Sequence, residues 1–238
     1  MISVGFKSEY NKEEISKLSV ISEADSFIYG FFDSENTLLE SARKNKSEIE
    51  GFLQLHNNYN TFILSKSNSF THIHSSKLEE VKNLLPFQDQ MNGEEIFTLF
   101  NDEWFSSSNN PNSIKHISTA IQTRFRFAEH PICYIHFNKS SILICICGST
   151  GFKFFNEFEI ENAEDIIYFT KSVLQTLNVD EEKVVLKLSG YIEEGYIFYK
   201  MLQRYFYNIE FTTAYNFHIR DNIGKGHYYF DHYLNIAF

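Results

Sequence analysis

The chain repeats a strand-rich pattern at an offset of 115 residues. When Ser26 is aligned with Ser141, an apolar stretch of the first half aligns with an apolar stretch of the second, and the turn that follows aligns with a turn. The matched parts are 27–32 with 142–147, 33–36 with 148–151, and Leu39 with Phe154. A repeat of this length indicates two similar units, each with its own core, and restricts the fold more than any single motif.

Each half is expected to contain the same order of strands and helix. Apolar stretches bounded by Asp, Asn, Ser and Gly predict strands, and apolar residues at helical spacing predict helices. In the first half we expect strands 18–22, 26–32, 37–41, 60–64 and 70–73, and helices over 47–56, capped by Ser47, and 78–85. In the second half we expect strands 132–137, 141–147, 152–159, 183–188 and 209–212, and helices over 117–127, 162–177, 193–205 and 227–238. The stretch 141–147 is so apolar that both of its faces must be covered.

Three meandering strands, a helix and a further strand describe a ribonuclease-H-like unit. We therefore expect an α/β fold of two tandem ribonuclease-H-like units, which is the actin-like ATPase architecture with a central cleft. The expected N-terminal unit is 1–116 and the expected C-terminal unit is 117–238.

Four blocks of the second half have a distinctive order and spacing. They are Phe154–Phe158, Glu164–Phe169, Leu186–Ile192, and His227–Phe230 continued through Leu234 and Asn235. With these blocks the sequence resembles an uncharacterised bacterial family, domain of unknown function 3822, over roughly 130–238 and more loosely over 18–41. The resemblance implies a duplicated actin-like ATPase fold, and it implies no known activity, substrate or partner.

Charge and hydropathy argue against two classes of protein, those that bind nucleic acid and those that span a membrane. The formal charge is −10, which argues against nucleic-acid binding because phosphate contacts need clustered Lys and Arg. The alternating segment 124–127 contains only two Arg, so we expect a solvated strand or helix end there. The longest central apolar run, 142–147, is far shorter than the ~20 residues that span a bilayer. Without a signal-peptide pattern and with three Cys, the chain is expected to be cytoplasmic and not bound to a membrane.

The turns that would bind a nucleotide in the wider actin-like superfamily depart from its pattern. Such turns use Gly to bring backbone N–H groups to phosphate, and an Asp to hold the hydrated metal. The turn 22–25 has Glu23 and Asp25 but no Gly, and the turn 136–140 has neither Gly nor an acid. Only Gly190 remains of the paired Gly that usually contact adenosine. We therefore expect no catalytic residues, no cofactor and no metal.

Other candidate sites are interpreted as structural. Cys145 and Cys147 share one strand face within an apolar run and are expected to be buried small side chains. A metal site at His72 and His74 would need a third ligand that the sequence does not locate. His227 and His232 are five residues apart, which is poor spacing for one helix face. The segment Gly224-Lys225-Gly226 is expected to be a flexible turn. The aromatic residues of 196–207 are expected to form core and domain-interface packing, although an exposed patch there would indicate a dimerising module.

Two function classes remain. The leading hypothesis is a non-catalytic actin-like ATPase relative that binds a protein partner as a cytoplasmic scaffold. The alternative is a divergent nucleotide-binding ATPase or kinase-like enzyme that uses Asp25, Asn138, Lys139 and Gly190 in the cleft between the halves.

Overall fold

The computed structural model describes residues 6–66, 70–74, 87–90, 96–100, 114–148, 151–212, 218–220 and 226–237. The chain divides into two compact units. Unit 1 is Met1–Ala120, Ala214–Gly226 and Asp231–Phe238, and unit 2 is Ile121–Thr213 and His227–Phe230. The division of the sequence expected at residue 116 stays a prediction.

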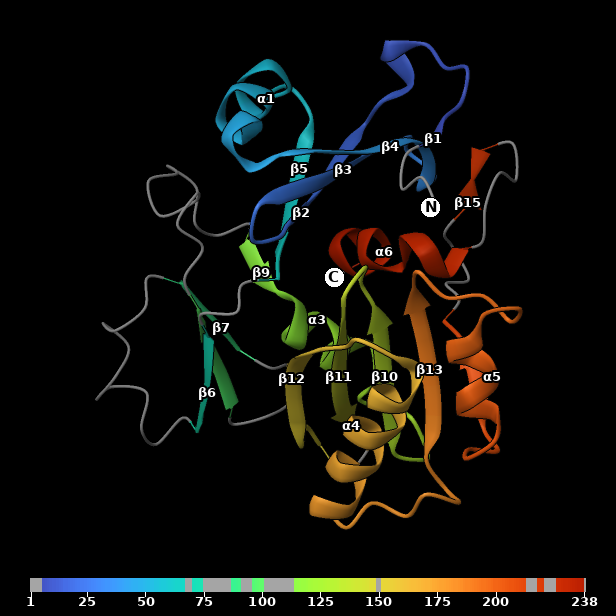
Figure 1. Cartoon of the computed structure of the whole chain (residues 1–238). Helices are drawn as coiled ribbons and strands as arrows, with labels where there is room; N and C mark the ends of the chain where they lie inside the picture. The colour runs from blue at the N-terminus through green and yellow to red at the C-terminus, as the bar shows by residue number, and fades with distance from the viewer. Residues whose placement is uncertain are drawn as a thin grey trace. The chain divides into compact units, whose positions relative to one another are not determined.

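Unit 1 is built on a mixed sheet of order β1-β4-β3-β2-β5-β9, with β15 paired to β4 (Figure 1). The strands are β1 (Phe6–Lys7), β2 (Lys17–Ser22), β3 (Ser26–Phe32), β4 (Thr37–Asn45), β5 (Asn60–Ser65), β9 (Ile114–His116) and β15 (His218–Ile219). The strands β2, β3 and β4 form an antiparallel meander, and β5 and β9 continue the sheet in parallel. The short helices η1 (Lys12–Glu14), η2 (Lys46–Glu48) and α1 (Ile49–Leu55) lie between the strands in sequence.

A second, three-stranded sheet is inserted between β5 and β9. It is antiparallel with the order β6-β8-β7, and its strands are β6 (Phe70–His74), β7 (Phe87–Gln90) and β8 (Ile96–Phe100). Only the first of these strands was expected from the sequence.

Unit 2 is built on the sheet β12-β11-β10-β13-β14 (Figure 1). Its strands are β10 (Ile132–Phe137), β11 (Ser141–Cys147), β12 (Phe154–Glu159), β13 (Val185–Gly190) and β14 (Ile209–Phe211). Its helices are α4 (Ala163–Thr176) and α5 (Ile197–Gln203). Two further helical segments contain residues of both units: α3 (Ile117–Phe125), and η5 (Gly226–Tyr229) followed directly by α6 (Phe230–Ile236). The meander β10-β11-β12 is antiparallel, and β13 and β14 are parallel to β10. The predicted fold class, two tandem ribonuclease-H-like units, is confirmed.

The sequence repeat corresponds to equivalent strand pairs. Ser22 pairs with Phe27 between β2 and β3, and Phe137 pairs with Ile142 between β10 and β11, at the predicted offset of 115. The third strand differs, because the pairing of β3 with β4 shifts between Phe31 and Phe32. As a result Glu40, rather than Leu39, occupies the position of Phe154.

Each unit has its own apolar core. In unit 1 alternate residues of β2 and β3, including Leu18, Val20 and Phe27, pack with Phe52 of α1. In unit 2 alternate residues of β10 and β11 pack with α4 and α5. Every residue of β11 is buried, as expected for a strand covered on both faces.

Several element boundaries differ from the sequence expectation. Strand β4 extends to Asn45, and η2 follows directly; Asn45 is the N-cap of η2 and Glu48 that of α1, so Ser47 caps neither helix. Helix α5 covers only the centre of the expected 193–205, because a turn occupies 194–196. The expected helix over 78–85 lies outside the described residues. No helix in the described part of the chain is long and apolar enough to cross a membrane.

Candidate functional site

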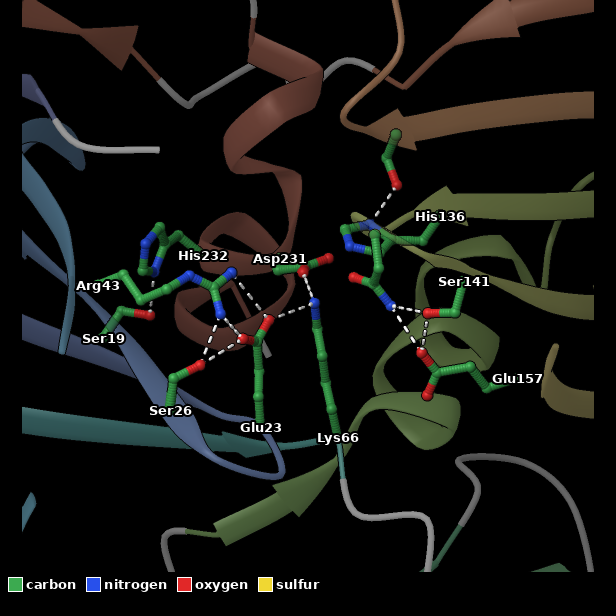
Figure 2. A network of polar contacts seen from close by, with 12 residues as sticks. Ser19, Glu23, Ser26, Arg43, Lys66, His136, Ser141, Glu157, Asp231 and His232 are labelled. Atoms are coloured by element: carbon green, nitrogen blue, oxygen red, sulfur yellow. Dashed lines mark hydrogen bonds and ion pairs between the residues drawn. The ribbon is translucent and has the colours of Figure 1, made fainter. Parts of the chain in front are cut away.

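Charged side chains converge at the turn between β2 and β3. We call Glu23, Ser26, Arg43, Lys66 and Asp231 the Glu23 cluster; all five belong to unit 1. The Glu23 carboxylate accepts hydrogen bonds from the Arg43 guanidinium and from Ser26 Oγ, the latter at 2.9 Å. Lys66 Nζ lies 3.6 Å from Glu23 Oε1 and 2.5 Å from Asp231 Oδ2. Figure 2 shows Glu23 between Arg43 and Lys66, with Lys66 reaching to Asp231.

The sheet topology explains why these groups meet. The parallel strands β2 and β5 end at the same edge, with Ser22 opposite Ser65, and Lys66 N donates to Ser22 O at 2.8 Å. Arg43 lies on β4 opposite Ile28, one strand away from the turn. Asp231 comes from α6, at the other end of the sequence.

The Glu23 cluster is largely removed from water. The side chains of Lys66 and Asp231 are only 6% and 9% exposed. Burial disfavours the charged form of Glu23, but Lys66 and Arg43 outweigh it and hold the pKa of this carboxyl below its ordinary value. The buried Lys46 also donates from Nζ to Ser22 Oγ and to Glu23 O. The carboxylates of Glu23 and Asp231 thus pair with Arg43 and Lys66 within the protein, and Lys46 adds a third cation that donates to oxygen atoms of the turn.

Unit 2 has a polar cluster at the equivalent turn. Asn138 Nδ2 donates to Glu157 Oε1 at 2.8 Å and to Ser141 Oγ at 3.2 Å, and Ser141 Oγ donates to Glu157 (Figure 2). Both turns contain the same backbone hydrogen bond, from Glu23 N to Ser26 O and from Asn138 N to Ser141 O, each 2.9 Å. The repeat therefore conserves the geometry of the turn.

The charges of the two clusters differ. Arg43 pairs with Ile28 in unit 1, and Glu157 pairs with Leu143 at the matching position in unit 2. A cation on the third strand of unit 1 is thus replaced by a carboxylate in unit 2.

Helix α6 is held on unit 1 by polar contacts next to the Glu23 cluster. His232 Nδ1 lies 2.8 Å from Ser19 Oγ, and its Nε2 lies 3.2 Å from Ser41 Oγ. Asn235 Nδ2 donates to Ser19 Oγ at 2.8 Å and to Phe62 O at 2.9 Å. Burial of the imidazole lowers the pKa of His232 to about 4, so the ring is neutral at pH 7.

The sequence of residues 57–209 matches the family described as protein of unknown function (DUF3822), over well more than half of the chain. The chain belongs to this family. No curated protein matches the sequence.

Two solved structures are similar over nearly the whole chain. A protein with an actin-like ATPase fold and unknown function from Bacteroides thetaiotaomicron has a TM-score of 0.66 at 17% identity, over 94% of this chain and 96% of that one. The PilM–PilN type IV pilus biogenesis complex has a TM-score of 0.56 at 8% identity, over 93% and 98%. At these identities the similarity establishes the fold, so this member of the family has the actin-like ATPase fold.

The structure places the predicted site residues of this family member as follows. Asp25 is exposed, and its carboxylate forms no hydrogen bond or ion pair with another described residue; its carbonyl accepts from Lys46 N at 3.0 Å. Lys139 is also exposed. Asn138 and Gly190 are brought to one edge of unit 2, because Phe137 pairs with Gly190 across the parallel strands β10 and β13.

Gly190 has a structural reason to be glycine. Its φ is +78°, and a Cβ atom built there would lie 2.3 Å from Phe137 O. Tyr191 N donates to that same carbonyl at 2.9 Å. The close approach of two backbones therefore accounts for this glycine without a ligand.

The other candidates lie in packing positions or outside the described residues. Cys145 and Cys147 are buried on β11, and burial raises the pKa of the Cys145 thiol well above its usual range. His227 is buried, with Nε2 2.8 Å from Ile192 O. The side chains of His72 and His74 on β6, and residues 224–225, lie outside the described residues. Across the described ranges, no group of three or more His, Cys, Asp or Glu could hold a metal ion.

Sequence reasoning missed Arg43, Lys66 and Asp231. The signal for Lys66 was present, since it lies two residues after the end of the predicted strand 60–64, where parallel strands gather polar groups. Asp231 gave no such signal, because its partner lies 165 residues earlier in the sequence.

Proposed function

We propose that this protein is a non-catalytic actin-like ATPase relative that acts as a cytoplasmic scaffold or protein-binding module in a bacterium. The observation that carries the proposal is the position of Glu23. The corresponding turn of the wider superfamily offers backbone N–H groups and Gly to phosphate, whereas this turn has no Gly and Glu23 faces Arg43 and Lys66. A carboxylate of the chain itself thus pairs with Arg43 and Lys66 next to the turn.

The second turn supports the same proposal. Asn138 and Ser141 are already hydrogen-bonded to Glu157. An incoming phosphate at this turn would meet a carboxylate, and the repulsion between like charges in a partly buried position disfavours binding.

The nature of the fold supports a protein partner. A similar structure is a complex of PilM with PilN in type IV pilus biogenesis, so a protein with this fold acts there in a protein assembly. A scaffold needs only the folded units and an exposed binding surface, and it does not need phosphate chemistry.

Calorimetric titration of the full chain with MgATP and MgADP, together with a phosphate-release assay, tests the proposal. We expect no heat of binding at millimolar nucleotide and no turnover. Micromolar binding with turnover that is lost in Glu23→Gln or Asp25→Asn, but kept in the exposed control Glu35→Gln, would contradict it.

The second candidate is a divergent nucleotide-binding ATPase or kinase-like enzyme that uses Asp25, Asn138, Lys139 and Gly190. It is favoured by one observation: Asn138 and Gly190 share the carboxyl edge of β10 and β13, where α/β sheets usually bind ligands. It predicts stabilisation by ATP of about 2.7 kcal/mol at 100-fold saturation. A melting temperature unchanged by millimolar ATP would remove this candidate.

A further inference from the structure

Large aromatic and basic side chains are exposed together on the helices of unit 2. Tyr168 on α4 is 67% exposed, Ile197 on α5 is 59% exposed and Tyr205 just after α5 is 48% exposed. Lys200 and Arg204 are also exposed. Figure 1 shows α4 and α5 on the C-terminal unit, and the two helices contact each other. We call Tyr168, Lys171, Ile197, Lys200, Arg204 and Tyr205 the α4–α5 face.

These side chains form one continuous surface. Ile197, Lys200 and Arg204 follow one another at helical spacing and therefore share a face of α5. Arg204 is next to Tyr205, whose ring lies 5.1 Å from Lys171 Nζ of α4. Tyr168 is one helical turn before Lys171, so the surface runs from one helix to the other.

Within the described part of the chain, two cations of the α4–α5 face have no carboxylate partner. Neither Lys200 nor Arg204 forms an ion pair or side-chain hydrogen bond with another described residue. Lys171 pairs with Glu181 at 3.0 Å, and Glu164 lies one turn before Tyr168. Two cations that pair with no described residue, on a chain of net charge −10, make this face complementary to an acidic partner.

The composition of the face suits a protein ligand. Tyr and Arg are enriched in interfaces and dominate their binding energy, whereas Lys alone is depleted there. A nucleic acid would require more cations than this face offers and would be repelled by the rest of the chain. A second copy bound about a two-fold axis would place this face against itself and bring two sets of the same cations close together.

We infer that the α4–α5 face binds an acidic segment of a different protein, with carboxylates against Lys200 and Arg204 and an apolar side chain against Tyr168 and Tyr205. The inference rests on the proposed protein-binding function and adds the surface and the chemistry of the partner.

Selection of random peptides displayed on phage against the full chain tests the inference. The peptides that bind are synthesised, and their affinity is measured by fluorescence anisotropy. We expect enriched peptides to be rich in Asp and Glu with at least one large apolar residue. Affinity should fall at least about tenfold in Lys200→Glu/Arg204→Glu and about tenfold in Tyr205→Ala, as interface hot spots do. The control Lys12→Glu/Lys153→Glu makes the same change in charge at exposed positions elsewhere and should leave the affinity unchanged.

Three results would overturn the inference. The first is enrichment of peptides without excess acid, or no enrichment at all. The second is equal binding by the two double variants, which would place the peptides elsewhere and leave the protein-binding function standing. The third is a dimer by light scattering that Lys200→Glu/Arg204→Glu dissociates, which would assign the face to self-association. The nucleotide titration described above tests the proposed function separately.

Discussion

Lys66 is the residue on which the charge balance of the Glu23 cluster depends. It contacts both carboxylates of the cluster from a buried position. Removing one member of a buried ion pair leaves an uncompensated charge, which costs about 3–5 kcal/mol. We therefore expect Lys66→Met to lower the free energy of unfolding by that amount in urea denaturation.

The matched control for this prediction is Lys44→Met. Lys44 forms an ion pair with Glu48 four residues later, near the surface, and its loss should cost no more than about 0.5 kcal/mol. Equal effects of the two substitutions would show that the Glu23 cluster does not stabilise unit 1.

His232 makes the stability of unit 1 depend on pH. Its pKa is about 4 in the folded protein because the ring is buried, and about 6.5 in an unfolded chain. The unfolded state therefore binds the extra proton between these values, and stability is lost as pH falls from about 6.5 to about 4. The loss is about 3 kcal/mol at roughly 1.4 kcal/mol for each pH unit.

Urea denaturation between pH 7.5 and pH 4.5 measures this dependence. In His232→Gln the slope of unfolding free energy against pH should be smaller than in the unmodified protein, by up to one proton. The exposed His218→Gln serves as the control and should retain the full slope. If all three proteins had the same slope, the pH dependence would have another source.

At the scale of residues, the sequence indicated where polar groups lie but not what they contact. Glu23 and Asn138 were recognised as turn residues, because Asp, Asn and Ser at strand ends satisfy backbone groups locally. The ion pair of Lys66 with Asp231 could not be recognised, because it depends on a helix that returns to the first sheet from the opposite end of the sequence.

The end of strand β13 provides a prediction at the scale of elements. Gly190→Ala should destabilise the protein by at least about 2 kcal/mol, because the positive φ is strained for alanine and its Cβ would meet Phe137 O. Gly195→Ala is the control, since a Cβ there has no atom within 4 Å. Thermal unfolding compares the two, and a similar melting temperature for both would mean that the turn tolerates a side chain.

The elements were predicted best where pattern and burial agree. The strands β10 and β11 and the helix α4 have long apolar patterns that packing reinforces, and their bounds differ from the prediction by at most one residue. Strand β4 runs beyond its apolar part, because Arg43 and its neighbours continue the pairing with β3. Strand β9 has only three residues and was missed, since its position is set by pairing with β5.

At the scale of the whole molecule, helix α6 completes unit 1. A chain that ends at Phe230 lacks His232 and Asn235, which bind β2, β4 and the backbone of β5. We expect the amides of β2 and β3 to exchange hydrogen at least about 100-fold faster, equivalent to about 3 kcal/mol, while β10 and β11 keep their protection. A chain that ends at Ala237 is the control. Equal loss of protection in both units would contradict the assignment of α6 to unit 1.

The return of α6 has a consequence for synthesis of the protein. Most of unit 1 lies before Ile121, but Asp231 and the rest of α6, which bind its sheet, are synthesised more than 100 residues later. At 5–20 residues per second, the segment between Ala120 and Asp231 takes roughly 5–20 s to make. During that time β2 and β3 lack their final helix, and a prematurely terminated chain never receives it. We therefore expect β2 and β3 of an unfinished copy to be cleaved faster by proteases than the same strands in a chain that includes α6.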